Sequence, residues 1–296
     1  MEKSLNAYSP YPNIILLGTQ RSGTTLLTRM LSAHSAIFIQ NEISVEKIFF
    51  GQPSTNEINA RCNEQIELRH GLSISQLLEN ENKKLWGFKD PQLTEHLDEL
   101  VPFLTTTKFI TIVRDPRGVV NSYIDNKWGL GTPAYTGALR WKNEVAAQEQ
   151  FMKLAPEQCL YIRYEDLVSN QEETLKTVCK HLEIEFEDSL LNYHKKKANF
   201  KLNASNINTN TSANKHFSTR WKDELSHRQV SEIEFVTKDL LVKNGYELTT
   251  SAKQPNWLRR ALYNIHQTIV GEYQIQYQLK KHAIKQFLAK RRAKNA

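Results

Sequence analysis

The chain has 296 residues and a formal net charge of +7, and 40% of its residues are hydrophobic. This length suits one large α/β domain with an appendage, which we favour, or two small domains. The three cysteines lie far apart with no Cys-x-x-Cys pair, so neither a disulfide framework nor a zinc ribbon is indicated. The sequence also shows no secretory leader and no run of eighteen apolar residues. We therefore expect a cytoplasmic protein.

The first recognisable unit runs from Ile14 to Thr25, IILLGTQRSGTT, where a strand-like apolar run breaks at Gly18. Helical spacing of apolar residues follows, so the pattern predicts a strand, a phosphate-cradling loop and a helix. The loop differs from a Walker A loop because Thr24 stands where the lysine should be, and the nearest cation is Arg21. Backbone N–H groups at such a helix start favour a bound anion. The segment thus predicts an anion site.

Three further apolar segments end in charged or polar side chains. Residues 85–88 precede Lys89, residues 108–113 precede Arg114, and residues 159–163 precede Tyr164. A shorter strand is expected at 36–39, and helices are expected between the strands, including one after Pro91 with leucines at 93, 97 and 100. Alternating strands and helices favour a parallel sheet, whose strand ends meet at one crevice. The predicted fold class is α/β, with a P-loop-like parallel sheet flanked by helices.

The remaining segments are more polar. Residues 51–82 are expected to form surface helices and loops that contribute to an acceptor pocket, and residues 203–214 a polar loop or lid. Residues 256–294 are expected to be helical, with one apolar side made by Leu258, Leu262, Ile265 and Ile269.

Charge is distributed unevenly along the chain. Residues 251–296 contain ten Lys or Arg and one acid, whereas the first 250 residues contain 29 basic and 31 acidic ones. We therefore divide the chain into an α/β domain over 1–250 and a basic helical extension over 251–296. Such a tail suits acidic membrane lipids, nucleic acid or an anionic glycan, and a solvated charged helix is the commoner case. Peripheral contact with the inner membrane surface is the option we retain for it.

Four motifs in chain order resemble one enzyme family: TQRSGTT, FITIVRDPRGVVNSY, YEDLV and RWKDEL. Over roughly residues 12 to 245 the chain resembles sulfotransferases that use 3′-phosphoadenosine 5′-phosphosulfate (PAPS). The arginine in its loop is similar to the tyrosylprotein and bacterial branches of that family. The resemblance implies PAPS as donor, adenosine 3′,5′-bisphosphate (PAP) as product, a hydroxyl-bearing acceptor, and no metal.

The resemblance also implies roles for individual residues. Arg21 is expected at the bridging oxygen of the phosphosulfate, and Lys89 is expected to contact the transferring group. Glu42, twenty-one residues after Arg21, stands at the spacing of the catalytic glutamate in the tyrosylprotein branch. The expected donor-binding residues are Gln20, Arg21, Ser22, Gly23, Thr24, Thr25, Arg114, Ser122 and Tyr164.

Several of these assignments keep a competing interpretation. Glu46 is the second choice as base, and a solvated surface glutamate is the alternative to both. His34 is expected to be structural, at the end of a helix, rather than a base. Tyr164 and Trp221 are each either adenine neighbours or ordinary core residues, and Arg117 is either a site residue or a surface one.

The acceptor is the least constrained part of the prediction. We expect a carbohydrate or glycolipid hydroxyl first, with peptide tyrosine or a small natural product as the alternative. A nucleotide kinase-like P-loop protein and a non-catalytic binder of anionic glycans are the alternatives of a different class. No nucleic-acid partner is expected, and the sequence leaves the oligomeric state open.

Overall fold

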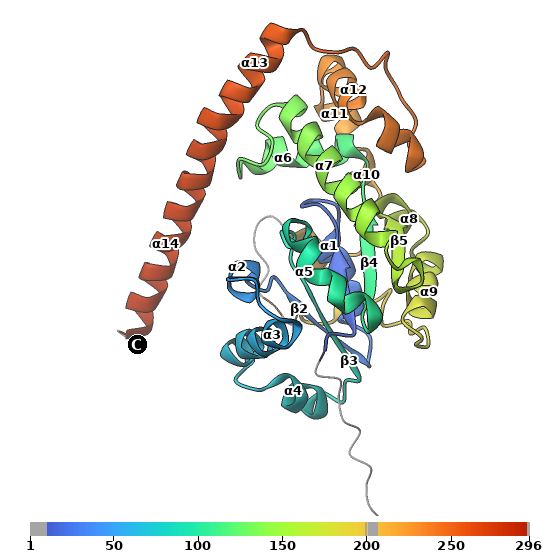
Figure 1. Ribbon diagram of the computed structural model, residues 1–296, viewed down its shortest axis with the longest axis vertical. Helices are drawn as coiled ribbons and strands as arrows, with labels where there is room; N and C mark the ends of the chain where they lie inside the picture. Colours follow the sequence, from blue (N-terminus) through green and yellow to red (C-terminus); the bar gives the residue numbers. More distant parts are fainter. Residues whose placement is uncertain (1–10, 199, 201–206, 295–296) are drawn as a thin grey trace, which may run out of the picture. The chain divides into compact units, whose positions relative to one another are not determined.

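The computed structural model describes residues 11–198, 200 and 207–294 (Figure 1). Of the predicted polar loop, residues 203–206 lie outside the described part of the chain. The chain forms two compact units. Unit 1 contains residues 1–114 and 144–216, and unit 2 contains residues 115–143 and 217–296. The boundaries of these compact units differ from the predicted boundary at residue 250. The assignment of the catalytic domain to 1–250 and of the basic extension to 251–296 stays a prediction.

Unit 1 is built on a parallel sheet of five strands in the order β2-β3-β1-β4-β5. The strands are β1 (Ile14–Leu17), β2 (Ile37–Asn41), β3 (Leu85–Lys89), β4 (Lys108–Val113) and β5 (Cys159–Arg163). The central strands β3, β1 and β4 are almost wholly buried, which is why they are mainly apolar runs rather than alternating ones. The predicted α/β fold with a parallel sheet is confirmed.

The register of the sheet aligns the carboxyl ends of its strands. Lys89 pairs with Leu16 on one side and with Asn41 on the other, and Val113 pairs with Arg163. Strands β2 and β3 are longer than predicted because Asn41 and Lys89 still take part in this ladder, although both are polar. Lys89 is therefore a strand residue and not a loop residue.

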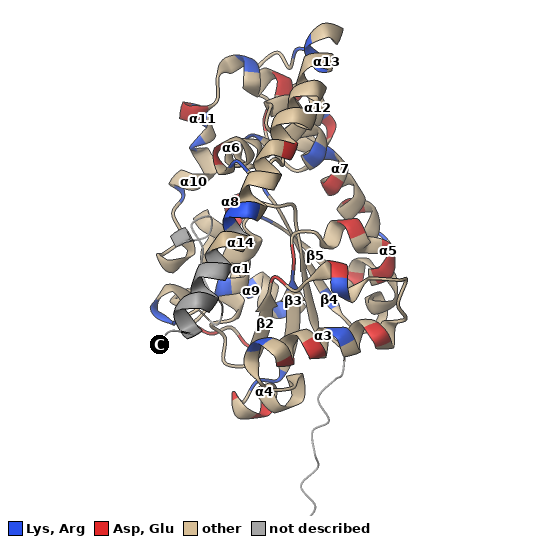
Figure 2. Cartoon of the chain, turned by 90° about the vertical axis from the view of Figure 1, so that its left-hand side faces the viewer, with Lys and Arg blue, Asp and Glu red and all other residues tan. Residues whose placement is uncertain are grey.

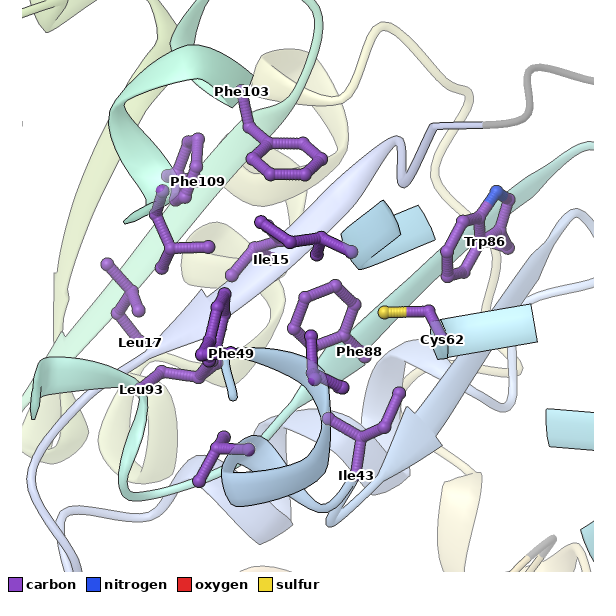
Figure 3. Close-up of a cluster of buried hydrophobic side chains, with 14 of the residues drawn as sticks. Ile15, Leu17, Ile43, Phe49, Cys62, Trp86, Phe88, Leu93, Phe103 and Phe109 are labelled. Atoms are coloured by element: carbon purple, nitrogen blue, oxygen red, sulfur yellow. The ribbon is translucent and has the colours of Figure 1, made fainter. Parts of the chain in front are cut away.

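One face of the sheet is covered by the segments between β2 and β4. Its cluster of buried side chains includes Ile15, Phe88 and Phe109 from the sheet (Figure 3). The covering elements are α2 (Val45–Ile48), α3 (Thr55–His70), α4 (Ile74–Asn80), η1 (Leu93–His96), α5 (Leu97–Leu100) and η2 (Val101–Thr105). On α3, Cys62 packs into this cluster, while acidic and basic residues are interspersed along the helix (Figure 2). The single helix predicted after Pro91 is instead three short turns, and Pro102, which lacks an N–H donor, lies in the last of them.

The opposite face is covered by α1 (Thr24–Leu31), α8 (Tyr164–Ser169) and α9 (Gln171–His181). Leu27 and Met30 of α1 pack there against sheet residues such as Ile110. Three short 3₁₀ segments also belong to unit 1: η3 (Pro156–Gln158), η4 (Tyr193–Lys195) and η5 (Ile207–Asn210).

Unit 2 is helical. It contains α6 (Pro116–Asn126), the first half of α7 (Ala134–Met152), α11 (Trp221–Glu224), α12 (His227–Lys243), α13 (Trp257–His266), the π-helical η6 (Gln267–Gly271) and α14 (Glu272–Lys294), and the short α10 (His216–Thr219) lies at its boundary. Its core includes Val120, Ala138, Trp221 and Ile233. Helix α12 begins with a capping box at Ser226 and Gln229. Among the described residues, no helix is both long enough and apolar enough to cross a bilayer.

Candidate active site

The loop between β1 and α1 is shaped by two glycines with positive φ. Gly18 has φ 151° and Gly23, the N-cap of α1, has φ 100°. A Cβ atom on Gly23 would lie 2.4 Å from Cδ2 of Tyr164, and one on Gly18 would lie 2.6 Å from the carbonyl oxygen of Ile112. Neither position can hold a side chain without moving its neighbours, so the loop backbone lies directly against β4 and α8.

This loop has the donors that an anion requires. The first N–H groups of α1 have no acceptor inside the helix, and they carry its positive dipole end. The hydroxyl of Ser22 donates 2.7 Å to the carbonyl oxygen of Thr19, which closes the turn. The buried Oγ1 of Thr19 has no hydrogen-bond partner among the described residues. The arrangement is that of an anion cradle with one polar group still to be satisfied.

Lys89 links the loop to the other side of the site. Its ammonium group donates to Oγ1 of Thr25 at 3.3 Å and lies 3.7 Å from Oε1 of Glu42. The side chain is only 2% exposed. Burial lowers the pKa of Lys89, the charge of Arg21 lowers it further, and the carboxylates of Glu42 and Asp90 oppose both effects.

Glu42 is fixed through its main chain, and its side chain extends toward Lys89. Its φ is 54°, its N–H donates 2.7 Å to the carbonyl oxygen of Lys89, and its own carbonyl accepts from Nη2 of Arg69 at 2.6 Å. Arg69 also binds the carbonyl of Asn41 at 3.1 Å. The Glu42 side chain is 47% exposed, so a carboxylate on a fixed backbone faces solvent beside the buried Lys89.

Two residues next to the Glu42–Lys89 pair, Arg69 and Asp90, have no role in the sequence-based prediction. Arg69, at the end of α3, binds the carbonyl oxygen of Glu42. In the sequence it could be noticed only as a basic residue in the last turn of a helix, within the region predicted to contribute to the acceptor pocket. Asp90 is the second neighbour. Burial raises its pKa to about 6, although the N–H of Gln92 and the charge of Lys89 pull it downward. A carboxyl group that titrates near neutral pH therefore adjoins Lys89.

Arg114 and Tyr164 lie together at the ends of β4 and β5, one step beyond the paired Val113 and Arg163. The guanidinium of Arg114 lies over the Tyr164 ring at 4.6 Å, and its Nη1 donates 3.0 Å to the carbonyl oxygen of Arg21. Burial raises the pKa of the Tyr164 hydroxyl, while the charges of Arg114 and Arg21 oppose that rise. Arg114 therefore fixes the loop backbone at Arg21, which carries a guanidinium group of its own.

The carboxyl edge of the unit 1 sheet thus collects Gln20, Arg21, Ser22, Gly23, Thr24, Thr25, Glu42, Lys89, Arg114 and Tyr164. Ser122 lies on α6 and belongs to unit 2, whereas Arg114 is the last residue of the first segment of unit 1. Joint binding of a 3′-phosphate by Arg114 and Ser122 remains a prediction.

The competing residues have other surroundings. Glu46 is exposed on the short helix α2. His34 is buried, with Nε2 bonded to the carbonyl of Glu185 at 2.9 Å and Nδ1 accepting from the N–H of Ala36, so it is structural. Arg117 is buried in unit 2, where it lies 4.1 Å from the Trp221 ring. It is therefore not a surface residue.

Among the described residues, no group of three or more His, Cys, Asp or Glu side chains is placed to hold a metal ion.

Comparison with known families gives the decisive observation. The model of a family described as the sulfotransferase family matches residues 12–188, which contain every residue collected at the sheet edge. The chain belongs to the sulfotransferase family. Its enzymatic activity is accordingly the transfer of a sulfuryl group.

Curated relatives of this sulfotransferase are distant. A Caenorhabditis briggsae protein named putative protein-tyrosine sulfotransferase is 25% identical, over 82% of this chain and 91% of its own length. Protein-tyrosine sulfotransferase 1 of Danio rerio is 27% identical, over 62% of this chain and 56% of its own length.

Solved structures agree with the fold of this sulfotransferase. A sulfotransferase domain from the curacin biosynthetic pathway has a TM-score of 0.58 at 24% identity, covering 80% of this chain and 99% of that domain. A mouse sulfotransferase solved with PAP has a TM-score of 0.52 at 16% identity, covering 78% of this chain and 85% of that one. At these identities the likeness shows the fold.

Proposed function

We propose that the chain transfers a sulfuryl group from PAPS to the phenolic hydroxyl of a tyrosine in a protein or peptide. Membership of the sulfotransferase family implies PAPS as the donor. The names of the curated relatives support a tyrosine acceptor over the carbohydrate that the sequence led us to expect first. The carbohydrate acceptor finds no support among these relatives.

The observation that carries the proposal is the position of Lys89. One ammonium group contacts Thr25 of the loop at 3.3 Å and lies 3.7 Å from the carboxylate of Glu42. A cation for the donor and a base for the acceptor are therefore neighbours, as in-line transfer to a hydroxyl requires.

The residues at the sheet edge fit a phosphosulfate. The close packing at Gly18 and Gly23 fixes the loop backbone against β4 and α8, and the buried Thr19 hydroxyl lacks a partner among the described residues. We assign the 5′-phosphosulfate to the N–H groups and hydroxyls of Ser22 to Thr25 and to the guanidinium of Arg21. Arg114, Tyr164 and Ser122 are assigned to the 3′-phosphate and adenosine part, and Gln20 to the edge of the loop.

Each charged group then has a defined task. Bound PAPS supplies the sulfuryl group, which passes in line from a phosphate oxygen to the acceptor oxygen. Glu42 accepts the proton of the attacking hydroxyl at its exposed carboxylate. Arg21 and Lys89 place positive charge where the donor phosphate becomes more negative. Arg69 acts indirectly, because it holds the backbone from which Glu42 extends.

The proposal is tested with ³⁵S-labelled PAPS and a panel of acceptors. The panel contains a peptide with one tyrosine, the same peptide with phenylalanine, a simple phenol and a neutral oligosaccharide. We expect label in the tyrosine peptide and none in its phenylalanine counterpart or the oligosaccharide. Label confined to the oligosaccharide would overturn the acceptor and leave the sulfotransferase assignment intact.

A further inference from the structure

The long C-terminal helix of unit 2 rests on its own unit by a polar side. Helix α13, the π-helical η6 and α14 follow one another without a break (Figure 1). Gln267 accepts from the N–H of Thr132 at 2.9 Å and donates to the carbonyl of Gly129, and Gln274 accepts from the N–H of Gly129 at 3.0 Å. A Cβ atom on Gly129 would lie 2.5 Å from the carbonyl oxygen of Gly271, so loop and helix touch backbone to backbone.

The apolar side of the same helix faces away from these contacts. Leu258, Leu262, Ile265 and Ile269 follow one another at intervals of four, three and four residues, which places them on one helix face. Each of the four is more than half exposed, between 52% and 65%. Surface helices ordinarily bury such a stripe against the core. Here the amphipathic helix is turned with its polar side inward.

Aromatic and basic side chains accompany the apolar stripe. Trp257 is 73% exposed, and Tyr273 and Tyr277 are 69% and 53% exposed and stack on one another. Arg259, Lys280 and Lys281 are also exposed. The segment has seven more basic residues: the partly exposed Arg260, Lys253, and five Lys or Arg within 285–294. Glu272 is the single acid between residues 251 and 296.

We propose that α13, η6 and α14 together form a helix that lies on an acidic lipid surface. The apolar stripe would enter the boundary between headgroups and acyl chains, with Trp257 and Tyr273 at headgroup level and the basic residues against anionic headgroups. This combination of a leucine and isoleucine stripe, interfacial aromatics and nearly unopposed positive charge is the chemistry of an interfacial helix. It is independent of the acceptor in the proposed function.

A second copy of the chain is a poorer occupant of the stripe. Pairing two such helices would bring together two segments of ten basic residues and one acid each. Stable helix pairs place opposite charges beside their apolar seam, and like charges there are repulsive. An acidic lipid surface instead neutralises the charges that flank the stripe.

The test is co-sedimentation of the full chain with vesicles. Phosphatidylcholine vesicles that include phosphatidylglycerol are compared with vesicles of phosphatidylcholine alone. We expect binding at least about tenfold stronger to the acidic vesicles, and a progressive loss of binding as salt is raised. Equal binding to both vesicle types, or none to either, would overturn the proposal.

Two variants identify the surface. Leu262→Gln with Ile265→Gln should weaken vesicle binding by about tenfold or more, because two side chains leave the apolar boundary. Arg259→Gln should weaken it about fivefold. The matched controls are Leu68→Gln, which removes an exposed leucine on α3, and Lys238→Gln, which removes an exposed charge on α12. The controls should bind as the parent does.

All five substituted positions are exposed, so the fold should tolerate the changes, and circular dichroism with the thermal midpoint verifies this. Light scattering of the parent supplies the competing outcome. A concentration-dependent dimer that Leu262→Gln with Ile265→Gln abolishes, without vesicle binding by the parent, would assign the stripe to a second copy and reject the lipid surface.

Discussion

In the proposed function, Glu42 is the residue on which the chemistry depends most directly. Glu42→Gln keeps the size of the side chain and the backbone bonds to Lys89 and Arg69 but removes the proton acceptor. We expect turnover to fall by about 10²- to 10⁴-fold, with PAP affinity changed little. Steady-state kinetics and calorimetric titration with PAP measure the two quantities.

Glu46→Gln is the control for this change, because Glu46 lies on the neighbouring short helix and is exposed. It should leave turnover nearly unchanged. If Glu46→Gln lowers turnover and Glu42→Gln does not, the base has been assigned to the wrong carboxylate.

Asp90 provides a pH-dependent prediction. Its folded pKa of about 6 lies above the ordinary value of 3.8, so the folded state retains a proton that the unfolded state releases. Stability is therefore lost as pH rises from about 4 to about 6, and Asp90→Asn should abolish that loss. At pH 7 we expect the variant to be more stable by about 1–3 kcal/mol, measured by urea unfolding.

At about pH 3, below the ordinary pKa of 3.8, the stability difference between Asp90→Asn and the parent should shrink to nearly zero, since both then carry a mostly neutral side chain in the folded and the unfolded state. A pH-independent difference would show that the effect comes from packing and not from titration.

At the scale of single residues, the sequence identifies candidate site residues that lie next to a motif. It does not identify residues that reach the site only through a contact distant in the sequence. Arg21, Lys89, Glu42 and Arg114 could be named because each follows an apolar strand or stands at a family spacing. Arg69 could not, because it binds a backbone carbonyl 27 residues earlier in the chain. No side-chain pattern records a contact that is made to the main chain.

At the scale of elements, the β1–α1 loop depends on Gly23. Gly23→Ala would place a Cβ atom 2.4 Å from the Tyr164 ring at a residue with φ 100°. We expect PAP binding to be lost and the free energy of unfolding to fall by about 2–4 kcal/mol. Calorimetric titration and urea unfolding measure these effects.

Gly71→Ala is the matched control for the loop. Gly71 also has a positive φ, 71°, but its Cβ would meet nothing within 4 Å. It should cost about 1 kcal/mol of stability and leave PAP binding intact. Similar effects of the two substitutions would mean that φ alone, and not the contact with Tyr164, determines the outcome.

The start of α6 is anchored by a second element-scale feature, the buried Arg117. Its guanidinium bonds Asp115 at 2.7 Å and Glu234 at 2.6 Å, and Glu234 also accepts from Thr249 and Thr250. Arg117→Met would leave two carboxylates buried without their cation. We expect a loss of about 3–5 kcal/mol in urea unfolding.

Arg228→Met, an exposed arginine on α12, should change stability by less than about 0.5 kcal/mol. A loss for Arg117→Met no larger than this would contradict the assigned role of the Asp115–Arg117–Glu234 network.

The predicted elements were most accurate where a single physical cause dominated. Strands 108–113 and 159–163 have the predicted bounds. The first is a short buried apolar run, whereas the second, at the edge of the sheet, is only partly buried. The ends of β2 and β3 were set too early, since the pairing of Asn41 with Lys89 continues the ladder into polar residues. The leucines at 93, 97 and 100 predict one helix after Pro91, yet residues 93–105 form three short turns.

At the scale of the whole molecule, the predicted division of labour between body and tail can be tested by truncation. The loop, Lys89, Glu42, Arg114 and Tyr164 all belong to unit 1, and the described side chains of the tail take no part in its two core clusters. A chain ending at Pro255 should therefore bind PAP within about threefold of the full chain, less than about 1 kcal/mol. Calorimetric titration measures this affinity, and complete loss of PAP binding by a folded truncated chain would contradict the division.

Lys89 has a consequence for the order of events in transfer. The same ammonium group contacts the donor loop through Thr25 and lies beside Glu42. In the proposed mechanism Glu42 takes up a proton and becomes neutral. The electrostatic attraction between its carboxylate and the Lys89 ammonium is then lost. The positive charge of Lys89 would then stabilise the leaving phosphate on the donor side more strongly, at the moment when that phosphate gains its negative charge. Deprotonation of the acceptor and stabilisation of the leaving group would thus be synchronised by one shared cation, without any movement of the backbone.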